Sequence, residues 1–75
     1  MDKAAFMEEL ANILDVDAVE EAANLRDYEA WDSLVVLSLV AMADSKFGFT
    51  LTFPEVKTLK TGAELWAFFE KRRTK

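Results

Sequence analysis

The sequence predicts an all-α fold, a small helical bundle formed by a single domain over residues 1–75. Residues 3–14 and 61–73 place apolar side chains at the three- and four-residue spacing of amphipathic helices. Residues 33–47 form an apolar run that is too long for a typical strand and that ends at Gly48, a residue common at helix ends. These three segments predict the three longer helices of the bundle.

The first helix is predicted over residues 3–14, with Asp2 as its N-cap. Residues 15–32 show no sustained periodicity and form a long first loop for so small a domain. We expect this loop to be held in place by its own apolar side chains. These are Val16, Val19, Leu25 and Tyr28.

The second helix is predicted over residues 33–47, with either Asp32 or Ser33 as its N-cap. Pro54 suits the first turn of a short third helix, predicted over residues 54–58. The last helix, residues 61–73, opens with a Thr-x-x-Glu capping box. Its expected inward residues are Leu65 and Phe69.

The charge is distributed unevenly along the chain. Residues 1–44 carry a formal charge of −9 and residues 45–75 carry +4, which gives the net charge of −5. A mainly acidic domain argues against a nucleic-acid partner and favours partners with basic surfaces. No targeting segment is recognisable and no apolar run is long enough to span a membrane, so we expect a cytoplasmic protein without a membrane partner.

The residue inventory makes autonomous catalysis improbable. The chain has no cysteine and no histidine, so disulfides, most metal sites and the commonest general base are excluded. A nucleophilic serine needs an adjacent base, and the nearest basic residue to Ser33 in sequence is Arg26, which stays protonated. We therefore predict no enzyme activity and no metal site in this chain.

Ser33 is the strongest candidate for a functional residue. At the start of a helix it is expected to be exposed, and the positive end of the helix dipole favours an attached phosphate. Asp32 beside it offers an acidic contact for a modifying enzyme. The alternative is that Ser33 is an ordinary N-cap and that the chain is an unmodified helical module for protein–protein interaction.

An ordered set of residues over most of the chain resembles the acyl carrier protein family. The motif Asp32-Ser33-Leu34 stands at its centre. The other matching positions, in order along the chain, are Ile13-Leu14, Val16, Val19, Phe47-Gly48, the apolar link Phe49-Thr50-Leu51, Thr61, Leu65 and Phe69. The resemblance implies a right-handed four-helix bundle of acyl-carrier type, with three longer helices and one short helix.

The same resemblance implies a function for Ser33. A phosphopantetheinyl transferase would move 4′-phosphopantetheine from coenzyme A onto its Oγ atom, with Asp32 and Leu34 beside the attachment point. The thiol of this arm would carry acyl groups as thioesters. Acyl-loading and acyl-processing enzymes would be the partners of a stand-alone, monomeric carrier, and the interior of the bundle would shelter the acyl chain.

Two features depart from the family's common pattern. Glu29-Ala30-Trp31 precedes the motif where the family often has Leu-Gly. Trp31 either packs as part of the core or contacts the arm or a partner.

The second departure lies on the second helix. If Leu37, Val40 and Phe47 point inward, the outward stripe is neutral and partly apolar. This stripe consists of Val35, Ser38, Met42 and Ser45. The corresponding surface of carriers in fatty-acid synthesis is acidic, so the stripe indicates partners from a specialised lipid or secondary-metabolite pathway. The alternative is a rotated helix with Val35 and Met42 in the core.

Overall fold

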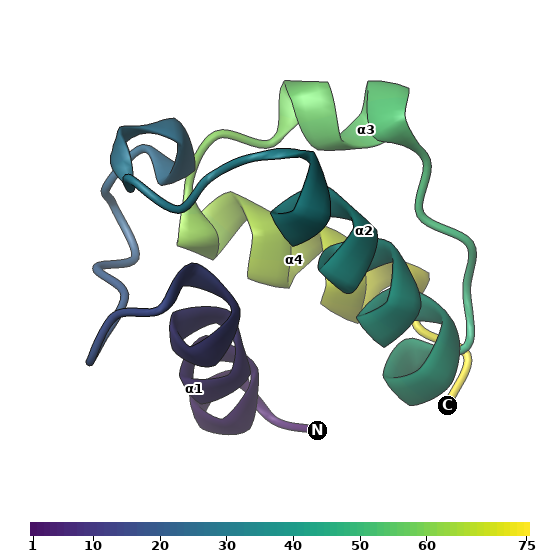
Figure 1. The fold of residues 1–75 in the computed structure, drawn as a ribbon. Coiled ribbons are helices and arrows are strands. Elements are labelled where there is room, and N and C mark those ends of the chain that lie inside the picture. Colours follow the sequence, from purple (N-terminus) through teal and green to yellow (C-terminus); the bar gives the residue numbers. More distant parts are fainter.

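A computed structural model describes residues 1–75 and shows four α-helices and no strand (Figure 1). The helices are α1 (Lys3–Leu14), α2 (Ser33–Met42), α3 (Phe53–Thr58) and α4 (Gly62–Arg72). A π-helical turn, Ala43–Phe47, continues α2, and a 3-10 turn, Leu25–Asp27, lies within the long first loop. The predicted fold class, a small all-α bundle with three longer helices and one short one, is confirmed.

The core is dominated by aromatic side chains from three different elements. Phe6 of α1, Phe47 of the π-helical turn and Phe69 of α4 are fully buried. Their ring centroids lie 5.1–5.9 Å apart. Phe47 packs edge-to-face against Phe6 and Phe69, an arrangement that aromatic rings favour, and the Phe6 and Phe69 rings are tilted by 60°. Figure 1 shows α1 beside α2 and α4, while α3 crosses one end of the bundle. The cluster therefore ties α1 and α4 to the far end of α2.

The helix ends follow the local signals in the sequence. An Asp2 carboxylate oxygen accepts a hydrogen bond from the Ala5 amide at 2.9 Å, and the Thr61 hydroxyl accepts one from the Glu64 amide at 3.1 Å. Gly48 ends the π-helical turn with φ of 74°, in the left-handed region that glycine adopts without steric cost. The observed bounds of the first, third and last helices differ from the predicted ones by at most one residue at either end. The segment 33–47, predicted as one helix, is an α-helix followed by the π-helical turn.

The long first loop is attached firmly to the bundle. Leu25 is fully buried, and the other three predicted anchors, Val16, Val19 and Tyr28, are partly buried against the core. The Arg26 guanidinium donates hydrogen bonds to the carbonyl oxygens of Leu59 at 2.9 Å and Val56 at 3.0 Å. These bonds satisfy carbonyl groups at the C-terminal end of α3. The loop and α3 are thereby fixed to each other.

The opposite end of α3 is also fixed. The amide and hydroxyl of Thr52 donate to one Glu55 carboxylate oxygen at 3.0 and 2.9 Å, and Arg72 of α4 donates to the other at 2.7 Å. The amide hydrogen bond first, and then the Arg72 contact, hold the pKa of Glu55 below its ordinary range. Because both ends of α3 are anchored, its inner side chains form a defined wall facing α2. None of the four helices has the length and apolarity needed to cross a membrane.

Candidate functional site

Ser33 is the first residue of α2, and Asp32 is the N-cap. A carboxylate oxygen of Asp32 accepts a hydrogen bond from the Val35 amide at 3.0 Å, and Asp32 has the extended backbone typical of this position. The Ser33 side chain is exposed, and its hydroxyl makes no hydrogen bond within the chain. The hydroxyl is therefore free to react, and the N-cap role considered for Ser33 belongs to Asp32.

The position of Ser33 favours a negatively charged substituent. The amide groups of the first turn of α2 lack partners within the helix, and the helix dipole places partial positive charge at this end. Asp32 uses one carboxylate oxygen to satisfy one of these amides. No other charged residue occurs until Asp44, beyond the end of α2. A phosphate on Ser33 Oγ would thus lie in a favourable field with a single acidic neighbour on its own helix.

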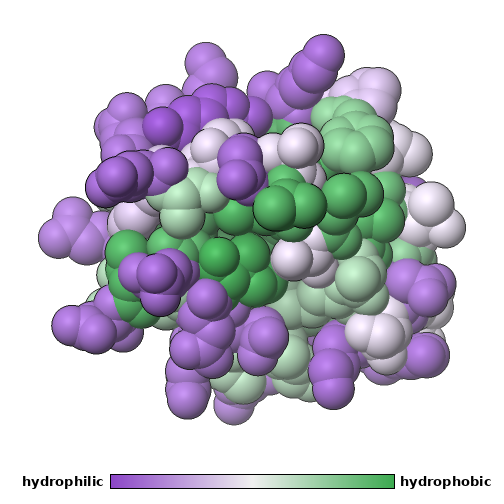
Figure 2. Space-filling view, in the orientation of Figure 1, coloured by the Kyte–Doolittle hydropathy of each residue, from purple (hydrophilic) through white to green (hydrophobic).

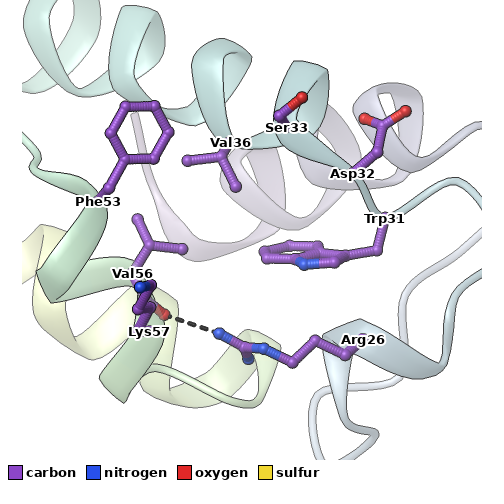
Figure 3. A pocket seen from close by; sticks show the side chains of 8 residues that line it. All are labelled: Arg26, Trp31, Asp32, Ser33, Val36, Phe53, Val56 and Lys57. Carbon is purple, nitrogen blue, oxygen red and sulfur yellow. Dashed lines mark hydrogen bonds between the residues drawn. The ribbon is translucent and has the colours of Figure 1, made fainter.

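A cavity of about 310 Å³ opens beside Ser33, between the start of α2, the long first loop and α3. Four of the lining side chains are apolar and two are cationic. The eight lining residues are Arg26, Trp31, Asp32, Ser33, Val36, Phe53, Val56 and Lys57. In Figure 3 the Ser33 hydroxyl lies at the rim and points away from the interior, while the Trp31 ring extends into it. The cavity therefore combines apolar walls with two cationic side chains, and a free hydroxyl lies at its rim.

Trp31 is held in place by Arg26. The guanidinium carbon lies 5.3 Å from the centroid of the Trp31 ring, within the range of a cation–π contact. Arg26 is itself fixed by its hydrogen bonds to Val56 and Leu59. Trp31 is half-buried and packs against the core, so the first of its two predicted roles, packing, is confirmed. Because the ring also lines the cavity, packing and ligand contact are compatible functions.

Comparison with protein-family models gives one decisive match. Residues 4–69 match the model for the phosphopantetheine attachment site, which is most of the chain. The chain belongs to this family. Members of the family are carrier proteins with covalently attached 4′-phosphopantetheine, and they interact with modifying and acyl-processing enzymes. Comparisons with curated proteins and with solved structures give no match.

The residues around Ser33 fit this cofactor of the carrier family. The arm is joined through a phosphate ester, and Ser33 offers an exposed, unpaired hydroxyl at a helix N-terminus. Arg26 and Lys57 add positive charge in the adjacent cavity, whose apolar walls suit the uncharged part of the arm. When bound, the cofactor supplies a terminal thiol that holds an acyl group as a thioester. The chain itself supplies the attachment atom and the surface around it.

The expected outward stripe on the second helix is wrong at two positions. Val35 is 5% exposed and Met42 is 6% exposed, so both belong to the core. Ser38 and Ser45 are exposed as expected. Leu37, expected to point inward, is 51% exposed, and Val40 is only partly buried. The helix is rotated relative to the prediction because apolar residues occur all around it and packing with α1 and α4 selects the buried side.

The rotation gives α2 a different exposed surface. Leu34, directly after Ser33, is 68% exposed, and Leu37 one turn later is also exposed. Phe53 at the start of α3 is 50% exposed. Figure 2, in the orientation of Figure 1, shows a band of hydrophobic residues crossing the face where α2 lies. The accessible surface next to Ser33 is therefore apolar and neutral, as the sequence indicated, but it is built from different residues.

Sequence reasoning did not single out five residues of the cavity as site residues, namely Arg26, Val36, Phe53, Val56 and Lys57. Phe53 and Lys57 come from α3, and no sequence rule indicates that this helix faces the start of α2. In the sequence, Arg26 stands out only as the basic residue nearest to Ser33, and it cannot act as a base because it stays protonated. It is, however, the single basic residue in the acidic segment 15–32, a signal that it has a specific partner.

Proposed function

We propose that Ser33 Oγ is the attachment atom for 4′-phosphopantetheine and that the chain carries acyl groups as thioesters on this arm. The observation that carries the proposal is the free, exposed hydroxyl of Ser33 at the first position of α2, with capping assigned to Asp32. Ser33 also lies within the segment matched by the family. Among the exposed hydroxyl groups of the chain, it alone lines a cavity that also contains two cations.

The attachment reaction is a transfer of the phosphopantetheinyl group from coenzyme A to the serine hydroxyl. Ser33 Oγ forms a new bond to the phosphorus next to pantetheine in coenzyme A. The pyrophosphate bond of coenzyme A breaks and adenosine 3′,5′-bisphosphate leaves. The hydroxyl proton passes to a base of the phosphopantetheinyl transferase, since this chain places no His beside Ser33. Asp32 and the exposed Leu34 flank the reacting atom and provide a polar and an apolar contact for the transferase.

The surface of α2 supports partners outside ordinary fatty-acid synthesis. Residues 33–43 contain no charged side chain, and the exposed positions Leu34 and Leu37 are apolar. A neutral surface gives little electrostatic attraction to a basic docking site. We assign the chain to a specialised lipid or secondary-metabolite pathway, in which partner enzymes contact Leu34, Leu37, Ser38 and Ser45 through apolar and hydrogen-bonding groups.

The test is an intact-mass measurement after incubation with coenzyme A, Mg²⁺ and a broad-specificity phosphopantetheinyl transferase. We expect the wild type to gain one phosphopantetheine and Ser33→Ala to gain none. Thr50→Ala is the control, because Thr50 is an exposed hydroxyl residue outside α2 and outside the proposed partner surface, and it should be modified like the wild type. A folded wild type that is modified by neither of two different transferases would favour an unmodified interaction module instead.

A further inference from the structure

We infer that Arg26 is a positioning residue for the reaction at Ser33. Its guanidinium joins the C-terminal end of α3 to the Trp31 ring, and this contact fixes the segment that leads into α2 (Figure 3). The inference rests on the proposed attachment at Ser33, and it adds a residue that sets how the hydroxyl is presented to the transferase. Arg26 acts through Trp31 and not on the reacting atoms.

The guanidinium of Arg26 is engaged by two acceptors and by an aromatic ring. Nη1 donates to the Leu59 carbonyl oxygen at 2.9 Å, and Nη2 donates to that of Val56 at 3.0 Å. The guanidinium carbon also lies over the Trp31 ring, 5.3 Å from its centroid. A planar fork of donors can serve two acceptors at once and still contact an aromatic ring, whereas a lysine ammonium is a compact point charge. The arrangement therefore depends on arginine at this position.

The backbone that carries the Arg26 side chain is fixed as well. The Arg26 amide donates to the side-chain oxygen of Asn24 at 3.0 Å. The preceding residue, Leu25, is fully buried, and its amide donates to the carbonyl oxygen of Lys60, between α3 and α4, at 2.7 Å. Arg26 therefore holds the Trp31 ring against a fixed point of the fold.

Trp31 connects this fixed point to the reacting serine. Between the buried Leu25 and Ser33, the side chains that pack against the core are those of Tyr28 and Trp31. Trp31 directly precedes the N-cap of α2, so it is the last anchored side chain before Ser33. Figure 3 shows its ring between Arg26 and the start of α2. Loss of the contact with Arg26 would therefore loosen the chain immediately before the helix.

The position of the hydroxyl matters because the transfer depends on alignment. The phosphorus of coenzyme A must meet Ser33 Oγ in line with the leaving group, and a misplacement of about 1 Å can lower such a rate by about 100-fold. Freedom in residues 28–31 would be passed to Asp32, whose carboxylate caps α2. Since Arg26 restricts this freedom without binding the transferase, it should affect kcat more than KM.

The experiment measures kcat and KM of the carrier for phosphopantetheinyl transfer, at saturating coenzyme A and with intact mass as the readout. Arg26→Gln is expected to lower kcat by about two- to fivefold, the effect of losing one cation–π contact, with little change in KM. Arg26→Lys keeps the charge but not the fork, so it should recover only part of the loss, and it provides the comparison if Arg26→Gln does not fold. A change confined to KM would overturn the inference, because Arg26 would then be a docking contact.

A matched control separates this role from a general loosening of α3. Arg72→Gln removes the ion pair with Glu55 at the other end of α3, and Arg72 does not line the cavity that contains Trp31. This variant should leave kcat unchanged. An equal loss of kcat for Arg26→Gln and Arg72→Gln would show that the rate follows the mobility of α3, and it would overturn the role of Trp31.

A double variant tests whether Arg26 acts through Trp31. Trp31→Leu should lower kcat about as much as Arg26→Gln, and the double variant should be no slower than either single one. Residues that act through one contact have non-additive effects, whereas independent residues have additive effects. Additive losses of kcat would therefore contradict the proposed route.

NMR of the unloaded protein gives a readout that does not depend on the transferase. Arg26→Gln should move the Trp31 indole N–H signal and leave that of Trp66, which packs against Phe47, in place. Trp66→Phe assigns the two signals. An unmoved Trp31 signal, or equal loading rates for the wild type and Arg26→Gln, would overturn the positioning role and leave attachment at Ser33 intact. A wild type that is not loaded at Ser33 would overturn both.

Discussion

Helices α4 and α2 have similar lengths, but they differ in how clearly the sequence shows which side of the helix is buried. In α4, Leu65 and Phe69 are fully buried, whereas Glu64 and Glu70 are exposed, so the sequence itself identifies the inner face. In α2, apolar residues surround the axis, and burial separates Val35 and Leu39 from the exposed Leu34 and Leu37. The comparison indicates that the apolar side chains of α4 serve mainly to stabilise the fold. The apolar residues that α2 leaves in solvent are available for binding.

The largest expected effect lies on α4. Phe69→Ala removes a fully buried ring that contacts Phe6, Phe47 and Phe49, so it should lower the free energy of unfolding by about 3–5 kcal/mol. Urea denaturation followed by circular dichroism measures this loss. Phe68→Ala is the matched control, because its ring is only partly buried, and it should cost clearly less. Equal losses for the two variants would contradict the assigned inner face of α4.

A pair of leucines on α2 tests the rotation of that helix. Leu39→Ala opens a cavity in the core and should cost about 2–5 kcal/mol, because Leu39 is fully buried. Leu37→Ala truncates an exposed side chain of the same type and should change stability by no more than about 0.5 kcal/mol. The same denaturation measurement applies to both. If Leu37→Ala lowered the free energy of unfolding more than Leu39→Ala, the sequence-based prediction that Leu37 points inward would be correct.

Much of the fold could be predicted because it depends on local signals. The N-caps Asp2 and Thr61, the helix end at Gly48 and the anchors of the long loop are short-range features, and the structure contains all of them. Ser33 could be identified for the same reason, since a serine after an acidic residue at a helix start is visible in the sequence.

The orientation of α2 could not be predicted because no polar face marks its outer side. Val35, Leu37 and Met42 have comparable hydrophobicity, and only the packing of α1 and α4 against α2 decides which of them are buried. The cavity beside Ser33 was missed for a related reason. Arg26 and Lys57 line the same cavity as the start of α2 only because of the fold, and no local rule connects positions this far apart in the sequence.

The smallest expected changes in stability concern two adjacent residues at the start of α2, Asp32 and Ser33. Asp32→Ala removes the hydrogen bond to the Val35 amide and should lower the free energy of unfolding by about 0.5–2 kcal/mol, whereas Asp32→Asn should retain most of it. Ser33→Ala removes a hydroxyl without a partner in the chain and should change stability by less than about 0.5 kcal/mol. Thermal unfolding of the three variants measures both effects. A loss for Ser33→Ala as large as that for Asp32→Ala would show that the serine is a structural cap. A loss confined to Asp32→Ala would leave Ser33 with no role in stability, which is the result expected for a serine that serves as an attachment site.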